Sequence, residues 1–301
     1  MRELSVVIPT WEMRRALARC AEMMQLETPQ FYGFVGYVIV VPQVENLAIG
    51  EWVNGLDPED AAIRVIETKE YLSPVEAMAI AGADLLTREA DLIAFIHDDV
   101  IIEQQGWEQV VLEHFAAHPK CGLAGFGGGV GFAHEDIYKV PYDYRQLARM
   151  GFVSNMREAE SHGRRATESQ RVAALDGFAL VCSSSFFWNA GRQAASPALG
   201  PGGSYNAWRA CLDDGIQFHM YDAWISCRAA ELQYETWMLP VACHHQGGQT
   251  SVTRQAEYAQ VVARLGYASA DELYAKGHQR VYERFAGLLP LRVPTPAPKG
   301  E

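Results

Sequence analysis

The stretch Asp91-Leu92-Ile93-Ala94-Phe95-Ile96-His97-Asp98-Asp99-Val100 determines which fold we expect. Its apolar run does not alternate with polar residues, which is typical of a strand buried on both faces of a parallel sheet. Ligands of open α/β sheets bind beyond the carboxyl ends of the strands, where Asp98 and Asp99 lie. These two carboxylates are therefore candidate ligands for a metal and a phosphate. A simpler alternative is that they begin a turn and cap the helix near Gly106.

Strands and helices alternate upstream of this stretch. The apolar and β-branched runs predict strands, and the helical spacing of apolar residues predicts helices. The expected elements are strands over 4–8, 36–41 and 62–67, a helix that passes through Leu17 and Met24, and a helix over 74–86. Strands with intervening helices imply right-handed crossovers and a mostly parallel sheet.

Downstream, a helix from Gly106 to His118 and a strand over 121–125 lead into a glycine run, Gly127-Gly128-Gly129-Val130-Gly131. Glycines let the backbone approach a ligand closely, but this run fails the third position of the Gly-x-Gly-x-x-Gly fingerprint. A nicotinamide-binding Rossmann site is therefore disfavoured. The chain contains no Gly-Lys pair, which excludes a Walker-type phosphate loop.

A long polar connection follows, from Phe132 to Leu175. Connections of this length are usually lids or binding loops, and we expect short helices within it. Its basic cluster is formed by Arg157, Arg164, Arg165 and Arg171 around His162. The alternative is a solvated helix face with paired charges.

Two further stretches carry candidate site residues. After a strand over 178–182 and a Pro/Gly-rich loop over 197–205, Asp222 precedes a helix over 223–232, which it could simply cap. A strand over 235–243 ends in His244-His245-Gln246-Gly247-Gly248. A single histidine there is usually structural, but neutral imidazole suits a divalent metal, and glycines leave room for a ligand.

Composition narrows the class of protein. The 301 residues are 49% hydrophobic and 21% charged, which favours a folded chain with a large core. A net charge of −12 argues against an extended grip on a polyanion. The six cysteines form no Cys-x-x-Cys pair, so we expect small core residues and no zinc ribbon. We find neither a secretory h-region nor a membrane-length apolar run and expect a soluble cytoplasmic protein.

The order of these features resembles the GT-A fold nucleotide-sugar glycosyltransferases of the family 2 type, in a sub-branch with a His-Asp-Asp-Val signature. Four stretches carry the resemblance: Ser5 to Thr10, Phe95 to Val100 with Gly106-Trp107, Asp176-Gly177, and Tyr221-Asp222 before the helix that leads to His244. The resemblance implies a GT-A domain over 1–250, with a nucleotide-sugar-binding half (1–125) and an acceptor-binding half (126–250). A helical extension (251–289) and a flexible tail (290–301) lie outside it.

The resemblance also implies an inverting hexosyltransferase that uses a nucleoside diphosphate sugar and Mn²⁺ or Mg²⁺. Asp222 matches the general base, Asp99 the metal ligand, and His244 or His245 the histidine that completes the metal site. The residues expected to bind the donor are Pro9, Thr10, Trp11, Glu12, Ser73 and Asp98. Two positions depart from the family's pattern: His97 stands where an acid is common, and Tyr221 stands where Glu is usual. The role of His97 stays open.

The residue types fit this chemistry without the resemblance. A divalent cation held by carboxylate offsets the charge of a diphosphate leaving group, and one carboxylate base can deprotonate an acceptor hydroxyl. Imidazole favours Mn²⁺. A single displacement by the acceptor inverts the configuration at the anomeric carbon.

Other functions remain open. A sugar-phosphate nucleotidyltransferase would need a Gly-rich basic loop where Pro9-Thr10-Trp11-Glu12 stands. A non-catalytic nucleotide-sugar-binding module would have no need of a base. The acceptor could be a glycan, a lipid-linked sugar, a metabolite, a protein or a hydroxylated base in DNA. For DNA, the basic cluster would contact phosphate and Trp188 and Trp208 would stack on bases. The sequence does not specify an oligomeric state.

Overall fold

The structure is a computed structural model that describes residues 3–28, 34–43, 63–86, 90–133, 149–157, 163–194, 207–247 and 253–293. The expected Pro/Gly-rich loop over 197–205 lies outside these ranges, as do His162 and most of the polar connection before Arg149.

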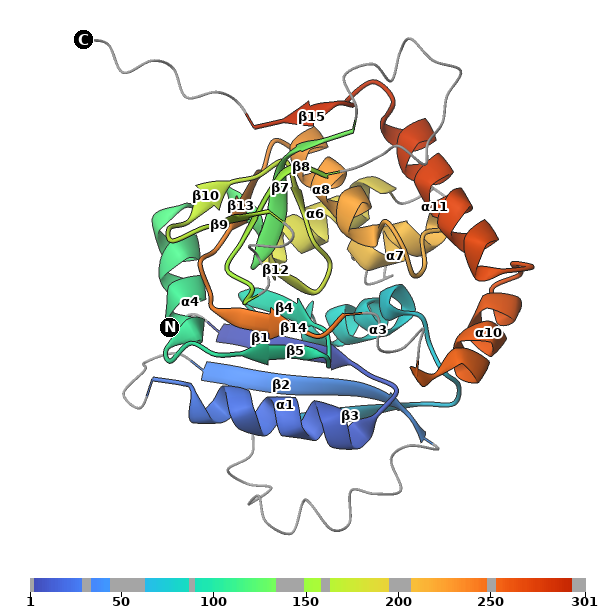
Figure 1. The fold of residues 1–301 in the computed structure, drawn as a ribbon, viewed down its shortest axis with the longest axis horizontal. Coiled ribbons are helices and arrows are strands. Elements are labelled where there is room, and N and C mark those ends of the chain that lie inside the picture. Colours follow the sequence, from blue (N-terminus) through green and yellow to red (C-terminus); the bar gives the residue numbers. More distant parts are fainter. Residues whose placement is uncertain are drawn as a thin grey trace.

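A large central sheet organises the described residues (Figure 1). Its strand order is β10 (Gln170–Arg171), β13 (Glu235–Met238), β6 (Cys121–Gly125), β12 (Ala179–Ser183), β4 (Leu92–Ile96), β1 (Glu3–Pro9), β2 (Phe34–Pro42) and β3 (Ile63–Thr68). Neighbours from β4 to β3 are parallel, as are β6 and β13. β12 runs antiparallel to both β4 and β6, and β10 to β13. The expected α/β fold with a mostly parallel sheet is confirmed, although strands from both sides of residue 125 share this sheet.

Helices cover both faces of the sheet, as the unbroken apolar strands predict. The helices are α1 (Met13–Gln25), α3 (Pro74–Leu86), α4 (Trp107–Ala117), α6 (Ser184–Ala194), α7 (Ala207–Asp213), α8 (Tyr221–Glu231), α10 (Gln255–Arg264) and α11 (Ala270–Phe285). Leu4, Val6 and Ile8 pack with α1 and α4, whereas Val7 packs with α3 and α8 on the other face. All six cysteines are buried and free, which confirms that they are core residues. Within the described ranges, no helix has the length and apolar character needed to cross a membrane.

A second sheet contains the glycine run. Its strands are β11 (Ala174–Leu175), β7 (Gly127–Phe132), β8 (Arg149–Ser154), β9 (Arg164–Arg165) and β15 (Leu291–Arg292). These glycines therefore allow close packing between strands, in place of the close approach to a ligand that the sequence suggested. The described part of the polar connection forms strands, and the short helices expected there are not seen in it. Leu291, in the expected flexible tail, is buried and pairs with Phe132.

Gly128 gives a direct test of this packing. A Cβ atom at Gly128 would lie 2.6 Å from the backbone oxygen of Ala174 in β11. We expect Gly128→Ala to lower the free energy of unfolding by about 1–3 kcal/mol, because the backbone must shift. Gly287→Ala, where nothing lies within 4 Å, is the control and should change it by less than about 0.5 kcal/mol. Denaturant midpoints at unchanged slope measure both. Equal midpoints for the two variants would contradict the β7–β11 packing.

A two-stranded ladder lies apart from both sheets. The strand expected over 235–243 is interrupted after Met238, since the segment that contains Pro240 separates β13 from β14 (Cys243–His245). β14 pairs antiparallel with β5 (Val100–Ile102), and His245 lies opposite Val100. This ladder brings the histidine pair to the end of β4.

Candidate active site

The turn after β4 exposes the polar end of the opening stretch. The backbone N–H of His97 donates to the oxygen of Phe178 in a 2.9 Å bond, and Val100 N–H donates back to the His97 oxygen at 3.2 Å. Asp98 and Asp99 lie in the turn between them and are both buried. They begin a turn, as the simpler alternative suggests, but Gly106 rather than either Asp stands at the N-cap of α4.

The register of the β5–β14 ladder decides which histidine meets Asp99. His245 lies opposite Val100 and His244 opposite Ile101, and neighbouring side chains on a strand point to opposite sides. His245 faces Asp99, with 3.4 Å between His245 Nε2 and Asp99 Oδ1. His244 is not among the described residues that line the cavity beside this cluster.

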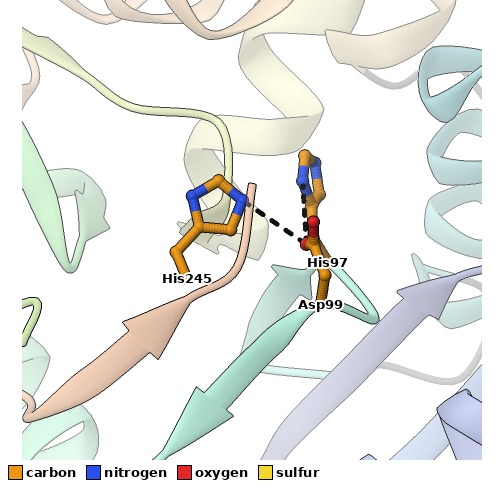
Figure 2. Close-up of side chains that lie close together, drawn as sticks. All are labelled: His97, Asp99 and His245. Atoms are coloured by element: carbon orange, nitrogen blue, oxygen red, sulfur yellow. Dashed lines mark ion pairs between the residues drawn. The ribbon is translucent and has the colours of Figure 1, made fainter. Parts of the chain in front are cut away.

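His97 joins the same cluster. Its Nδ1 lies 4.0 Å from Asp99 Oδ1, and ligand atoms of His97, Asp99 and His245 all lie within 4.8 Å of one another. Figure 2 shows both imidazole rings directed toward the Asp99 carboxylate, each from its own segment of the chain. The sequence motif contained this residue but gave no means of choosing its role.

The protonation of the cluster suits a cation. Burial alone would raise the pKa of Asp99, but contact with His245 and the nearby His97 lower it on balance. Burial lowers the pKa of His97, so its neutral form is favoured. Asp99 Oδ1 is buried, and none of the described residues donates a hydrogen bond to it. An ionised carboxylate with an unsatisfied oxygen, beside the neutral His97 ring and the His245 ring, is a donor set for a divalent metal ion.

A cavity of about 270 Å³ opens beside the cluster, at the carboxyl ends of β1, β2, β3 and β4. Several residues expected to bind the donor line it: Pro9, Thr10, Trp11, Ser73 and Asp98. Glu12 is not among the described lining residues and instead pairs with Arg15 and Arg254.

Asp98 and Thr10 join the ends of β4 and β1. The Thr10 hydroxyl donates to Asp98 Oδ2 at 2.5 Å. Burial raises the pKa of Asp98 to about 6, although the Thr10 bond and the Arg15 charge act in the opposite direction. The pair forms a polar patch on the wall of an otherwise largely apolar cavity.

Ser73 lies on this wall as the start of α3. Its hydroxyl accepts from Glu76 N–H at 3.1 Å, and its own N–H donates to Glu76 Oε2 at 2.8 Å, which is a capping box. The hydroxyl also donates to Gln217 Oε1 at 2.9 Å. Ser73 therefore has a clear structural role beside any contact with a ligand.

Apart from Trp11, the aromatic wall of the cavity was missed from sequence. Trp11 meets Phe218 edge to face with ring centroids 6.0 Å apart, and Phe218 meets Tyr258 at 4.9 Å. Tyr258 comes from α10, in the C-terminal extension, and its hydroxyl lies 3.1 Å from His219 Nε2. Arg264, also on α10, pairs with Glu76 of α3 at 2.5 Å. The only sequence signal for this contact is the apolar face of α10, and that face does not indicate which element it packs against.

Asp222 lies in the first turn of α8, where Met220 is the N-cap residue. Its Oδ1 accepts from Ala223 N–H at 2.7 Å, and its Oδ2 accepts from Gly177 N–H at 3.0 Å and pairs with Arg149. Burial alone would lower the pKa of Arg149, but the Asp222 and Asp176 carboxylates raise it on balance. Asp222 is not among the described residues that line the cavity, although Tyr221 beside it is.

The residues suggested for DNA binding are not arranged for that purpose. Trp208 is fully buried against Phe95, which contradicts its expected stacking role. Arg157 pairs with Glu103, and Arg171 with Glu235. The described part of the basic cluster matches the paired-charge alternative more closely, although on a turn and strands rather than on a helix.

Comparison with known proteins adds a family match. Residues 52–192 match the model of a family described as glycosyltransferase-like. No curated protein has a matching sequence. This match includes β4 and the His97–Asp99 turn and supports sugar transfer as the activity of this domain.

Two solved structures are similar in shape at low identity. One is the mannosyltransferase PcManGT from Pyrobaculum calidifontis in complex with GDP-Man and Mn²⁺, with 14% identity and a TM-score of 0.48 over 95% of this chain and 75% of that one. The other is A197 from STIV, with 11% identity and a TM-score of 0.36 over 83% of this chain and 87% of that one.

Proposed function

We propose that the chain is a metal-dependent, inverting glycosyltransferase of the GT-A type that takes its sugar from a nucleoside diphosphate donor. The observation that carries the proposal is the buried Asp99 Oδ1, which lies 3.4 Å from His245 Nε2 and accepts no hydrogen bond from the described residues. Leaving a buried carboxylate oxygen unsatisfied is costly, so a site that keeps one is suited to an external cation.

Asp99, His245 and His97 would hold Mn²⁺ or Mg²⁺, and a cation bound there would offset the negative charge that builds on the diphosphate as the glycosidic bond breaks. Thr10 and Asp98 line the cavity and would meet the polar part of the nucleotide, and Pro9 and Trp11 would meet its apolar face.

Asp222 is the proposed general base. Two donors occupy its Oδ2, but among the described residues Ala223 N–H is the one donor to its Oδ1, and a carboxylate oxygen has two lone pairs. Oδ1 can therefore accept the proton of an acceptor hydroxyl as that oxygen attacks the anomeric carbon. Arg149 and Gly177 N–H hold the carboxylate in place. A single displacement assisted by this one base inverts the configuration at the anomeric carbon.

The alternatives account for fewer of these contacts. A nucleotidyltransferase would need basic groups after β1 to hold a triphosphate, and Glu12 follows β1 instead. A pure binding module would use the cavity and the metal cluster but would not need Asp222. The acceptor is a glycan, a lipid-linked sugar, a metabolite or a protein in this proposal; a hydroxylated base in DNA loses support with the burial of Trp208.

A melting-point screen tests the proposal. We expect one class of nucleoside diphosphate sugar to raise the melting temperature in the presence of MnCl₂, because a ligand that binds only the folded state stabilises it by mass action. At a hundredfold excess over its Kd, the gain is about 2.7 kcal/mol. Adding EDTA should remove most of the shift.

The hit is then assayed for release of nucleoside diphosphate with candidate acceptors. Binding without release would identify a binding module. No shift with any nucleoside diphosphate sugar would overturn the proposed donor.

A further inference from the structure

The two residues that depart from the family's pattern contact each other. His97 Nε2 lies 2.7 Å from the Tyr221 hydroxyl oxygen, although the two residues are 124 positions apart in the chain. His97 follows β4, and Tyr221 begins α8. The imidazole that faces Asp99 with one nitrogen is therefore held by a phenol at the other nitrogen.

The Tyr221 hydroxyl has a single proton, and a second acceptor competes for it. The hydroxyl donates to the backbone oxygen of Gly177 at 3.1 Å. A hydroxyl that donates to a carbonyl can only accept from a third group, so the His97 contact requires a proton on Nε2. The Nδ1 atom of a neutral His97 then carries a lone pair, and it is this atom that lies 4.0 Å from Asp99 Oδ1.

The phenol is fixed in this position by close packing. Tyr221 is buried, and its ring meets Trp208 edge to face with centroids 5.5 Å apart. A Cβ atom at Gly177 would lie 2.5 Å from the Tyr221 oxygen, so only glycine allows the hydroxyl to reach the backbone there.

We propose that Tyr221 is a positioning residue which holds His97 in the Nε2–H tautomer, and that His97 thereby serves as a third protein ligand, through Nδ1, for a cation bound by Asp99 and His245. This inference rests on the proposed function, because it assumes that the cluster binds a divalent cation. A histidine ligand commonly donates its other ring N–H to a fixed partner, which sets the tautomer and ring orientation. In this chain the partner of His97 is a neutral phenol rather than a carboxylate, so it adds no negative charge beside the site. Asp99 is the single negative group among the three proposed ligands.

The first test reads the tautomer in the metal-free protein. Long-range ¹H–¹⁵N NMR of histidine-labelled protein, with His97→Gln to assign the signal, should show His97 as the Nε2–H tautomer. In Tyr221→Phe the signal should shift toward a mixture of tautomers. An Nδ1–H tautomer in the wild-type protein would overturn the proposal, and this result does not depend on the folding of any Tyr221 variant.

The second test measures the affinity for MnCl₂ alone by the EPR signal of free Mn²⁺. Tyr221→Phe keeps the ring and removes the hydroxyl, and we expect the Kd for Mn²⁺ to rise about 10- to 100-fold, as is typical when a partner of a metal ligand is lost. The matched control is Tyr267→Phe, since the Tyr267 hydroxyl also donates to a glycine oxygen, that of Gly215 at 3.2 Å, away from the cluster. The Kd of Tyr267→Phe for Mn²⁺ should equal that of the wild-type protein.

The outcomes separate the two proposals. If the wild-type protein binds no Mn²⁺, the metal-dependent function fails. If it binds Mn²⁺ and Tyr221→Phe binds it equally well, the metal site stands and the role of Tyr221 is overturned. His97→Gln with unchanged Mn²⁺ affinity would likewise remove His97 from the ligand set.

Discussion

An Asp222→Asn variant is expected to bind the donor as the wild-type protein does and to transfer its sugar about 10²- to 10⁴-fold more slowly, which is the usual contribution of a general base. Asparagine keeps the shape of the side chain and can still accept from Ala223 N–H, but it cannot accept a proton from the acceptor. Donor binding should survive because the described walls of the cavity do not include Asp222. Single-turnover rates with the donor found by the melting-point screen measure the effect.

The same substitution also breaks the ion pair with Arg149. Removing one partner of a fully buried pair costs about 3–5 kcal/mol, and this partly buried pair should cost less, but the variant must still be shown to be folded at the assay temperature. Asp214→Asn is the matched control, because Asp214 accepts from Trp224 of the same helix at 2.7 Å and an amide oxygen can replace it. The control should transfer sugar normally. Undiminished transfer by Asp222→Asn would remove Asp222 from the mechanism and leave it as an anchor for Arg149 and Gly177.

An Asp99→Ala variant is expected to lose metal-dependent binding of nucleoside diphosphates. Asp99 supplies the single carboxylate of the cluster, and two imidazole rings without a carboxylate attract a hard divalent cation weakly. Calorimetry with a nucleoside diphosphate should show the same weak binding with and without MnCl₂. The control is Asp91→Ala, at the opposite end of the same strand, where the carboxylate accepts from Glu3 N–H at 2.8 Å.

The stability of the metal-free Asp99→Ala variant provides a second measurement. Contacts with His245 and His97 lower the pKa of Asp99 on balance, so the ionised carboxylate stabilises the folded protein at neutral pH and its removal costs some stability. We expect the melting temperature without metal to fall, while the further rise on adding MnCl₂ disappears. A rise on adding MnCl₂ equal to that of the wild-type protein would contradict the role of Asp99 as a ligand.

Local sequence patterns were sufficient for the strands and helices around the site. The apolar run before His97 and the β-branched run before Pro9 predict buried parallel strands, and the carboxyl ends of such strands meet at one edge. The approximate place of Thr10, Asp98 and Asp99 follows from that rule alone.

Long-range pairing explains what could not be predicted. The choice between His244 and His245 depends on the register of β14 against β5, and a shift of one residue would exchange their directions. The contact between His97 and Tyr221 needs α8 and β4 to pack together, and Tyr258 reaches the cavity only because α10 docks beside α3. The strand assigned to the glycine run was missed because glycine has low strand propensity, while close packing against β11 favours it.

The β5–β14 ladder makes the candidate cation site a junction between distant parts of the chain. Asp99 and His245 lie far apart in the sequence, and three residue pairs join their strands. An ion bound between them would act as a reversible cross-link of a large loop, in addition to the pairing of β13 with β6. Cation supply would then influence how long β14 stays paired with β5, in addition to its part in the chemistry.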